Sequence, residues 1–372
     1  MMRRDLLTLA AVALALVAWL GWQTRPQKDT DGRLSTRGLL NDAPETFRQV
    51  TEPRPFSFPA DHAAHPGYRN EWWYFTGNLE GPGGEAWGFQ FTLFRFELDQ
   101  APRPESAWSA DAVWMAHLAL SDVDGRVFHQ AERFARGALG LAGATEDRWW
   151  LRDWVVERNG NRFDLTAATG DFGLDLAMEA MRPIVRQGEA GYSRKGPQPG
   201  NASHYYSITR LSATGSVRVA GRERPVEGLA WLDREWGSSQ LSDDLAGWDW
   251  FSLQLDDGRD VMVYRLRTDH GEASQFSAGK VVYPDGTART LGPDDFTATP
   301  QREWRDSEGN AWPVEWTVEI PSENLSLTVS ARFADQRWTG AVSYWEGAVG
   351  VHDADSGETL GRGYLELSGY AE

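Results

Sequence analysis

The chain has 372 residues, a formal net charge of −17 and no cysteine. The lack of cysteine excludes disulfides, thiolate metal sites, a cysteine nucleophile and lipid attachment at a signal-peptide cysteine. The acidic balance disfavours nucleic acid and anionic lipid surfaces as partners, because like charges repel. Nineteen tryptophans predict a β-rich protein with large apolar contacts, and the length predicts about two domains.

Residues 1–28 have the pattern of an export segment. Arg3 and Arg4 precede an apolar run over residues 6–20, and a polar linker over residues 29–47 follows. A positive region before a short apolar core is typical of a signal peptide, and a twin-arginine signal is one form of it. No clean Ala-x-Ala site follows, so a removed peptide and an uncleaved membrane anchor both remain open. We therefore expect an exported protein that is periplasmic or anchored to the inner membrane.

The stretch over residues 65–80 is the first strong strand signal. Glu71 is followed by four consecutive aromatics, residues 72–75, which favour a strand and place large side chains on both of its faces. A strand covered on both faces suits the wall of a closed barrel. The returning strand, residues 87–97, changes its apolar phase near Leu93, which predicts a β-bulge or a sharp bend there.

Further short strands follow at spacings of roughly ten residues, and a long Gly/Pro-rich loop spans residues 187–200. The second half opens with an echo of the first. Residues 248–255 align with residues 72–79, and each segment precedes a Gly-containing turn and a strand that ends in arginine. We interpret this echo as a duplicated hairpin. The pattern predicts an all-β protein with one barrel over residues 48–238 and a second over residues 239–372.

Several motifs together resemble one known family. They are His65-Pro66 with Glu71-Trp72-Trp73-Tyr74, residues 116–122, residues 205–211, residues 228–237 (Gly-Leu-Ala-Trp-Leu-Asp-Arg-Glu-Trp-Gly), and residues 344–348 with 363–367. The chain resembles the lipocalin-like family of carotenoid 1,2-hydratases and AttH proteins, often described as predicted secreted hydrolases. The resemblance implies two consecutive lipocalin-like antiparallel β-barrels. The family's members divide between hydratases of isoprenoid double bonds and exported proteins thought to work beside ABC-type exporters.

Hydration of an unactivated alkene requires an acid that protonates carbon, a base for water and an apolar pocket. Desolvation raises the pKa of a buried carboxyl, which then stays protonated near neutral pH. Asp233, two residues after Trp231, has suitable surroundings, and His204 is the best partner. The resemblance to the hydratases implies the same Asp–His pair. The opposing interpretation is structural, with Asp233 and Glu235 flanking Arg234 in ion pairs at a domain junction.

The remaining candidate residues of a ligand pocket are Tyr206, Trp231, Glu71, Trp72, Tyr74 and His117. Structural roles stay open for two of them: Glu71 as the partner of an arginine, and His117 as a satisfied histidine of the barrel wall. The histidines and Glu71 show no short ligand spacing, so we expect no metal and no cofactor. The sequence has no Gly-x-Ser-x-Gly elbow, phosphate loop or dinucleotide fingerprint.

The leading hypothesis is an exported protein that binds an apolar small molecule, lipid-like or isoprenoid-like, in envelope transport. Such a ligand requires a concave aromatic cavity with a few polar groups. The permease of an inner-membrane ABC transporter is the expected protein partner. The alternative hypothesis is a hydro-lyase that adds water to an isoprenoid double bond through Asp233 and His204. Glu71 has no counterpart ahead of the repeated aromatics, where Gly247 stands, which makes the first barrel the better place for a ligand.

Overall fold

The computed structural model describes residues 46–98, 106, 108–238, 241–242 and 244–371. These residues form strands and loops with two short 3-10 helices, η1 (Ala60–His62) and η2 (Pro321–Glu323), and they contain no α-helix. No helix within the described ranges has the length and apolar character that a membrane span needs. The expected export segment, residues 1–28, and nearly all of the expected linker lie outside the described residues.

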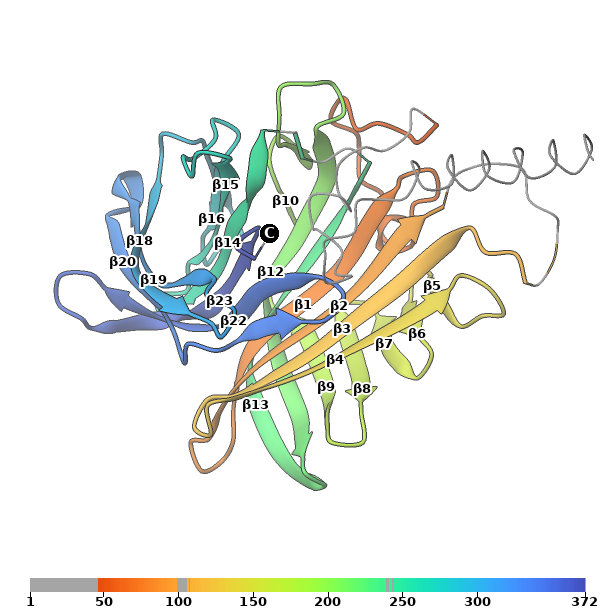
Figure 1. Ribbon diagram of the computed structural model, residues 1–372, viewed down its shortest axis with the longest axis horizontal. Helices are drawn as coiled ribbons and strands as arrows, with labels where there is room; N and C mark the ends of the chain where they lie inside the picture. Colours follow the sequence, from red (N-terminus) through yellow and green to blue (C-terminus); the bar gives the residue numbers. More distant parts are fainter. Residues whose placement is uncertain (1–45, 99–105, 107, 239–240, 243, 372) are drawn as a thin grey trace, which may run out of the picture.

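The first half of the chain forms one antiparallel sheet of thirteen strands (Figure 1). Its main path runs β4-β3-β2-β1-β13-β12-β9-β8-β7-β6-β5, and β10 and β11 pair with β12. The strands are β1 (Asn70–Glu80), β2 (Ala86–Glu97), β3 (Ala112–Asp122), β4 (Val127–Arg136), β5 (Ala142–Ala144), β6 (Arg148–Leu151), β7 (Trp154–Asn159), β8 (Arg162–Ala168), β9 (Phe172–Ala180), β10 (Val185–Arg186), β11 (Tyr192–Arg194), β12 (Ala202–Val219) and β13 (Arg222–Gly237). The sheet curves until β4 approaches β6, which makes a nearly closed barrel.

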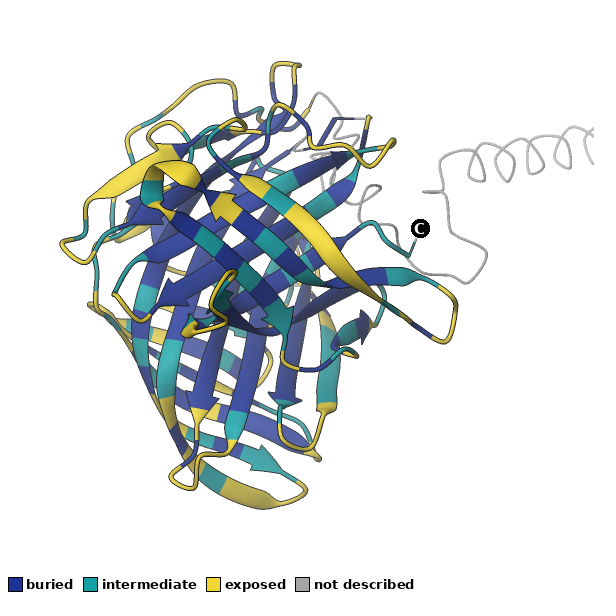
Figure 2. Ribbon diagram, turned by 90° about the vertical axis from the view of Figure 1, so that its left-hand side faces the viewer, coloured by how far each residue is buried: buried dark blue, intermediate teal, exposed yellow. Residues whose placement is uncertain are grey.

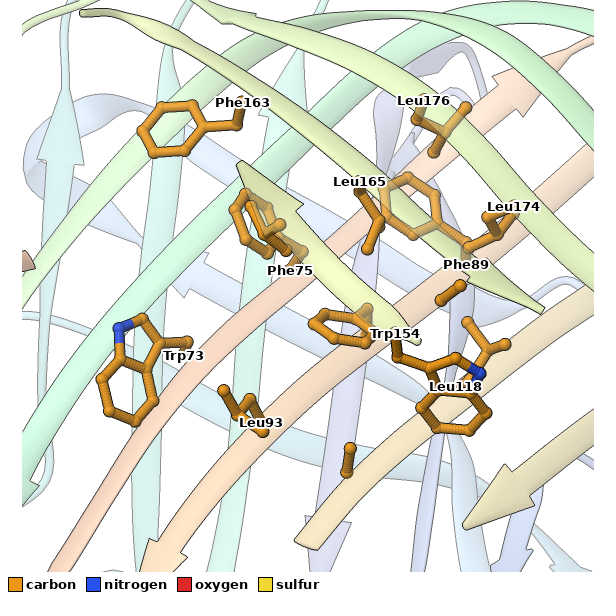
Figure 3. Close-up of a cluster of buried hydrophobic side chains, with 14 of the residues drawn as sticks. Trp73, Phe75, Phe89, Leu93, Leu118, Trp154, Phe163, Leu165, Leu174 and Leu176 are labelled. Atoms are coloured by element: carbon orange, nitrogen blue, oxygen red, sulfur yellow. The ribbon is translucent and has the colours of Figure 1, made fainter. Parts of the chain in front are cut away.

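Large side chains fill the interior of this barrel (Figure 3). Successive side chains of a strand point to opposite faces, so Trp73 and Phe75 of β1 both point inward. There they belong to one cluster with Trp154 of β7 and Phe163 of β8, and all four side chains are almost fully buried. Each such side chain stabilises the fold by about 1.5–3 kcal/mol. The interior is therefore a packed core that holds the sheet in its curved shape.

The outer face of the same strands is buried too, because the second half of the chain covers it; buried strands run through the centre of Figure 2 in dark blue. Phe94 and Phe96 of β2 pack there with Trp338 and Tyr344. Because the second half of the chain covers this face, β2 carries apolar residues on both of its faces near Leu93. β2 pairs with β1 and β3 in unbroken register, so the predicted bulge near Leu93 is wrong. A register shift lies instead in β12, where it pairs with β13.

The second half forms a ten-stranded antiparallel sheet that curves into half a barrel (Figure 1). Its order is β17-β16-β15-β14-β23-β22-β20-β19-β18, with β21 beside β22. The strands are β14 (Leu245–Leu255), β15 (Asp260–Thr268), β16 (Ala278–Val282), β17 (Ala288–Leu291), β18 (Thr297–Arg305), β19 (Ala311–Ile320), β20 (Leu325–Ala331), β21 (Arg337–Thr339), β22 (Ser343–Asp353) and β23 (Thr359–Ser368). A separate core that includes Phe251, Trp316 and Trp345 stabilises this sheet.

The hairpins β1–β2 and β14–β15 occupy equivalent places in the two sheets. β1 lies between β2 and β13, the last strand of the first sheet, and β14 lies between β15 and β23, the last strand of the second. The predicted duplication of this hairpin is therefore confirmed. The equivalence extends to single positions, because Tyr74 stands opposite Asp233 and its counterpart Trp250 stands opposite Glu366. Each sheet thus places one carboxyl group at the matching point.

A buried carboxylate ties the two sheets together. Asp260, at the start of β15, accepts hydrogen bonds from Arg182 (2.7 Å), Thr209 (2.8 Å) and Arg210 (2.7 and 2.9 Å) of the first half. Gln254 of β14 donates to two backbone carbonyls of the first sheet. A buried ion pair contributes most when its remaining hydrogen-bonding groups are also satisfied. These contacts fix the faces of the two sheets relative to each other.

Candidate active site

A cavity of about 140 Å³ lies between the outer face of the first sheet and the second sheet. This volume is similar to that of an apolar cavity that binds one benzene molecule. The aromatic side chains that line it include Trp72, Tyr74, Phe94, Trp248, Trp250 and Tyr264. The ionisable side chains among its lining residues include His117, Lys195, Asp233, Glu235, Glu346 and Glu366. Strands of both sheets thus supply the apolar walls and most of the charged groups.

Three donors hold the Asp233 carboxyl group of β13. Trp231 Nε1 (2.8 Å) and Ser207 Oγ donate to Oδ1, and the Tyr205 hydroxyl donates to Oδ2 at 2.7 Å. Burial raises the pKa of Asp233 to about 6, because the hydrogen bonds and the Lys195 charge offset only part of the desolvation cost. At pH 7 Asp233 is therefore mainly ionised and can accept a proton close to neutral pH.

Lys195 reaches the cavity from the loop between β11 and β12. Its ammonium group pairs with the Glu235 carboxylate and lies 6.0 Å from the centre of the Trp72 ring, within the range of a cation–π contact. Burial lowers the pKa of Lys195 to about 7, although Asp233 and Glu366 favour the charged form. Lys195 therefore also exchanges a proton near neutral pH.

Two glutamates face each other across β22 and β23. Glu346 and Glu366 are partners in the strand register, so their side chains lie on the same face of the sheet. The Tyr74 hydroxyl donates to Glu346, and Trp248 Nε1 donates to Glu366 Oε1 at 3.0 Å. Burial raises the pKa of Glu366 to about 7. Burial, together with the like charge of Glu366, raises the pKa of Glu346 well above its ordinary value. The pair therefore retains a proton at pH 7.

His117 of β3 joins the cavity to Glu132 of β4. The ring is fully buried and stacks on Trp338 with 4.2 Å between the ring centres. Nδ1 lies 2.7 Å from the Tyr344 hydroxyl oxygen, and Nε2 lies 3.1 Å from Glu132 Oε2. Burial lowers the pKa of His117, although the Glu132 carboxylate favours the charged form. At pH 7 the ring is therefore neutral, with one nitrogen as donor and the other as acceptor.

The expected acid–base pair of Asp233 and His204 is not formed. His204 and Tyr206 alternate along β12 with the two residues that donate to Asp233, so their side chains point to the opposite face of the sheet. His204 packs there against Trp236 with 5.6 Å between the ring centres. The Tyr206 hydroxyl lies 2.6 Å from Nδ1 of His62. Neither residue lines the cavity, because a strand turns successive side chains to opposite faces.

Glu71 also faces away from the cavity. Its Oε1 lies 2.6 Å from Arg234 Nη2 and 2.6 Å from His65 Nδ1. Burial alone would raise the pKa of Glu71, but the charges of Arg234 and His65 outweigh burial and hold the pKa at about 2. Glu71 is thus a permanent anion that joins β1 to β13 and to the segment before β1.

The predicted pocket and catalytic residues that line the cavity are Trp72, Tyr74, His117 and Asp233. Trp231 lies beside the cavity as a donor to Asp233. Four ionisable lining residues were not predicted as site residues: Lys195, Glu235, Glu346 and Glu366. Of these, only Glu235 appears among the sequence predictions, as an ion-pair candidate. A signal was present for two of them, since Glu346 and Glu366 each interrupt a run of apolar strand residues. An ionisable residue in such a run is buried and has a perturbed pKa.

The arrangement suits proton transfer more than metal chemistry. Within the residues that the structure describes, no group of three or more His, Asp or Glu side chains is placed to hold a metal ion. The cavity instead combines a glutamate pair that carries a proton, an aspartate that can accept one, and aromatic faces that stabilise positive charge. These are the groups that general acid–base catalysis on an apolar substrate requires.

Comparison with known proteins identifies the family. The AttH-like family model matches residues 49–370. The chain belongs to the AttH-like family. A crystal structure of an AttH protein from Nitrosomonas europaea is 34% identical to this AttH-like chain, with a TM-score of 0.78, and covers 87% of this chain and 100% of that one. The resemblance inferred from the motifs and the all-β, lipocalin-like fold are therefore confirmed.

The AttH-like fold also occurs in proteins of lower identity. Kievitone hydratase from Nectria haematococca is 14% identical with a TM-score of 0.63, over 87% of this chain and 97% of that one. The structure of CghA with Sch210972 is 15% identical with a TM-score of 0.54, over 89% and 96%. These two likenesses show the fold alone. The dehydratase asqC of Emericella nidulans is 25% identical over 174 residues, 45% of this chain and 48% of that protein, so the chain spans about half the length of this curated relative.

Proposed function

We propose that this protein is an acid–base enzyme of the hydro-lyase class, which adds water to an apolar substrate or removes it. The observation that carries the proposal is a pair of facing glutamates near a hydrogen-bonded aspartate in an aromatic cavity. Relatives named as a hydratase and a dehydratase support this proposal over ligand binding alone. The largely aromatic lining favours a hydrocarbon-rich substrate of the isoprenoid kind.

The two sheets supply opposite roles. Glu346 and Glu366 of the second sheet act as the acid, because burial of two facing carboxyls keeps a proton on the pair. Asp233 of the first sheet acts as the base, because its three hydrogen-bond donors favour the ionised form. An acid and a base whose pKa values lie near the working pH transfer protons most effectively. His204 has no role in the proposed chemistry, since it lies on the other face of β12.

In the hydration direction, a proton moves from the glutamate pair to one carbon of the double bond, and the other carbon becomes a cation. A water oxygen then bonds to this cation, and Asp233 accepts the proton that the added water releases. The alcohol leaves, Asp233 loses its proton to solvent, and the glutamate pair takes one up. The sum is one alkene and one water converted to one alcohol, and dehydration follows the same steps in reverse.

Aromatic faces stabilise the cation between these steps. Trp72, Tyr74 and Trp250 line the cavity beside the carboxyl groups. A cation over such a ring gains about 0.5–2 kcal/mol, and more when water is excluded. The positive charge is therefore held close to the base that completes the reaction.

The experiment measures turnover of acyclic isoprenoid alkenes and alcohols in ¹⁸O-labelled water, with mass spectrometry of the products. Wild-type protein is expected to form alcohols that carry the label, and Asp233→Asn is expected to lower the rate by about 10²–10⁴-fold. His204→Gln is the matched control, because its side chain is buried on the opposite face, and its rate should equal that of the wild type. Full turnover by Asp233→Asn, or no turnover by wild type on any compound, would refute the proposal.

A second candidate function is binding without turnover, since the aromatic lining suits an apolar ligand in either case. From residues 1–28 and the family resemblance, we also propose that the protein is exported to the periplasm or anchored at the inner membrane. There it would work beside the permease of an ABC transporter. Mass spectrometry of lipids that co-purify with the protein tests this candidate. A bound apolar molecule that is recovered unchanged after long incubation would favour it over the hydro-lyase.

A further inference from the structure

A line of hydrogen-bonded side chains leads from the protein surface to the cavity. It begins at Glu132 of β4, whose side chain is 19% exposed, and continues through the fully buried His117 of β3. Glu132 Oε2 lies 3.1 Å from His117 Nε2, and His117 Nδ1 lies 2.7 Å from the Tyr344 hydroxyl. Tyr344 and Glu346 lie two residues apart on β22, so their side chains share one face of the strand, and both line the cavity. The line therefore crosses from the first sheet to the second and ends at the glutamate pair.

We propose that Glu132, His117 and Tyr344 form a proton relay that returns protons from solvent to Glu346. The relay rests on the proposed function, in which the glutamate pair gives up one proton in each hydration. The cavity-side end of the line is the group that needs the proton, and the outer end is the one that solvent reaches. Each member of the line has both a hydrogen-bonding group toward solvent and one toward the cavity.

The transfer balances at every atom. Once Glu346 is ionised, the Tyr344 hydroxyl gives its proton to the carboxylate and takes the proton of His117 Nδ1. His117 Nε2 takes a proton from Glu132, which has taken one from water. One proton enters at Glu132 and one arrives at Glu346, and His117 changes from the Nδ1–H to the Nε2–H tautomer. Rotation of the imidazole between transfers turns the protonated nitrogen back toward Tyr344, so the next proton can also move inward.

The surroundings of His117 leave few other partners. Phe94 of β2 meets the ring edge-on, and Trp338 of β21 stacks on its face. The titratable groups in contact with the imidazole are thus Glu132 and Tyr344 at its two nitrogens. The backbone N–H of Ala341 donates to the Glu132 carboxylate and fixes its position. A role limited to fastening the two sheets would need the hydrogen bonds but not their ability to carry protons.

The test follows proton exchange by infrared spectroscopy and needs no substrate. The carboxyl C=O band that disappears in Glu346→Gln reports the protonated Glu346, and its shift after rapid mixing with D₂O gives the exchange rate. We expect Tyr344→Phe and His117→Gln to slow this exchange by about 100-fold, the lower end of what a positioned proton-transfer group contributes. Glu132→Gln, at the exposed end, keeps a hydrogen-bonding amide beside His117 Nε2 but cannot pass on a proton, and it should slow the exchange similarly.

Tyr206→Phe is the matched control. It removes the hydroxyl of another buried His–Tyr pair, His62 with Tyr206 at 2.6 Å, on the face of the first sheet away from the cavity. Its exchange rate should equal that of the wild type. Exchange at the wild-type rate in folded Tyr344→Phe and Glu132→Gln, or no protonated Glu346 band at pH 7, would overturn the relay. Loss of the hydro-lyase assignment alone would instead appear as full turnover by Asp233→Asn, with slow exchange still seen in the relay variants.

Discussion

Replacement of Glu366 by glutamine tests whether the cavity holds a protonated carboxyl pair. Gln keeps the acceptor oxygen for Trp248 Nε1, which lies 3.0 Å from Glu366 Oε1, but it cannot ionise. The pKa of Glu366 is raised by burial from its ordinary 4.5 to about 7. Between these two values the folded protein binds a proton that the unfolded chain does not. The stability due to this proton is full below pH 4.5 and is lost as the pH rises through 7.

The size of the effect follows from the pKa shift. One pKa unit corresponds to about 1.4 kcal/mol, so the shift of Glu366 corresponds to about 3 kcal/mol of unfolding free energy. The Glu366→Gln variant does not lose this stability as the pH rises, because its side chain stays neutral. The free energy of unfolding of the variant, relative to wild type, should therefore rise by about 3 kcal/mol between pH 4.5 and pH 7 and then stay constant.

Urea unfolding of both proteins across this pH range measures the difference. Groups that do not interact with Glu366 titrate alike in both proteins and cancel in the comparison. Glu358→Gln, in the exposed segment between β22 and β23, is the control for the substitution itself. The assignment of a retained proton to this pair would be refuted if the free energy of unfolding of Glu366→Gln, relative to wild type, stayed constant or fell as the pH rises.

Three further variants test the contacts around the cavity. Glu71→Ala leaves Arg234 buried without its carboxylate and should lower the free energy of unfolding in urea by about 3–5 kcal/mol; a loss below about 1 kcal/mol would contradict the buried ion pair. Asp260→Ala removes the carboxylate between the sheets and should lower the free energy of unfolding by about 3 kcal/mol, measured by thermal unfolding. An unchanged unfolding midpoint would show that other contacts hold the two halves together. Lys195→Met removes a charge that lowers the pKa of Asp233, so the acidic limb of the pH–rate profile should move to higher pH; a limb that stays in place would separate Lys195 from the base.

The fold was predictable because its signals are local. Alternating apolar residues and regularly spaced turns indicate short antiparallel strands wherever they occur. The echo of residues 72–79 in residues 248–255 could be aligned by eye, and the two hairpins do occupy equivalent positions. The place of the cavity could not be predicted in this way. Phe94 and Phe96 show that a strand has an apolar outer face, but not that a second sheet covers this face and leaves a cavity there.

The candidate site was predictable only in part, because strand pairing depends on register. Asp233 was singled out for its aromatic surroundings, and the structure places it in the cavity. His204 was predicted as its partner, and the resemblance to the hydratases implied the same pair. In the observed register Asp233 stands opposite Ser207, so residues of β12 with odd numbers near this point share its face and His204 does not. A shift of one residue would reverse this arrangement, and nothing in a single strand sequence fixes that shift.

The most direct test of the account is the position of the ligand in a crystal structure of the protein with an apolar alcohol or alkene that it turns over or that co-purifies with it. We expect the reactive carbon to lie between the two sheets, within hydrogen-bonding distance of Asp233 through a water or hydroxyl oxygen and beside the Glu346–Glu366 pair. A ligand found instead inside the first barrel, against Trp154 and Phe163, would contradict it.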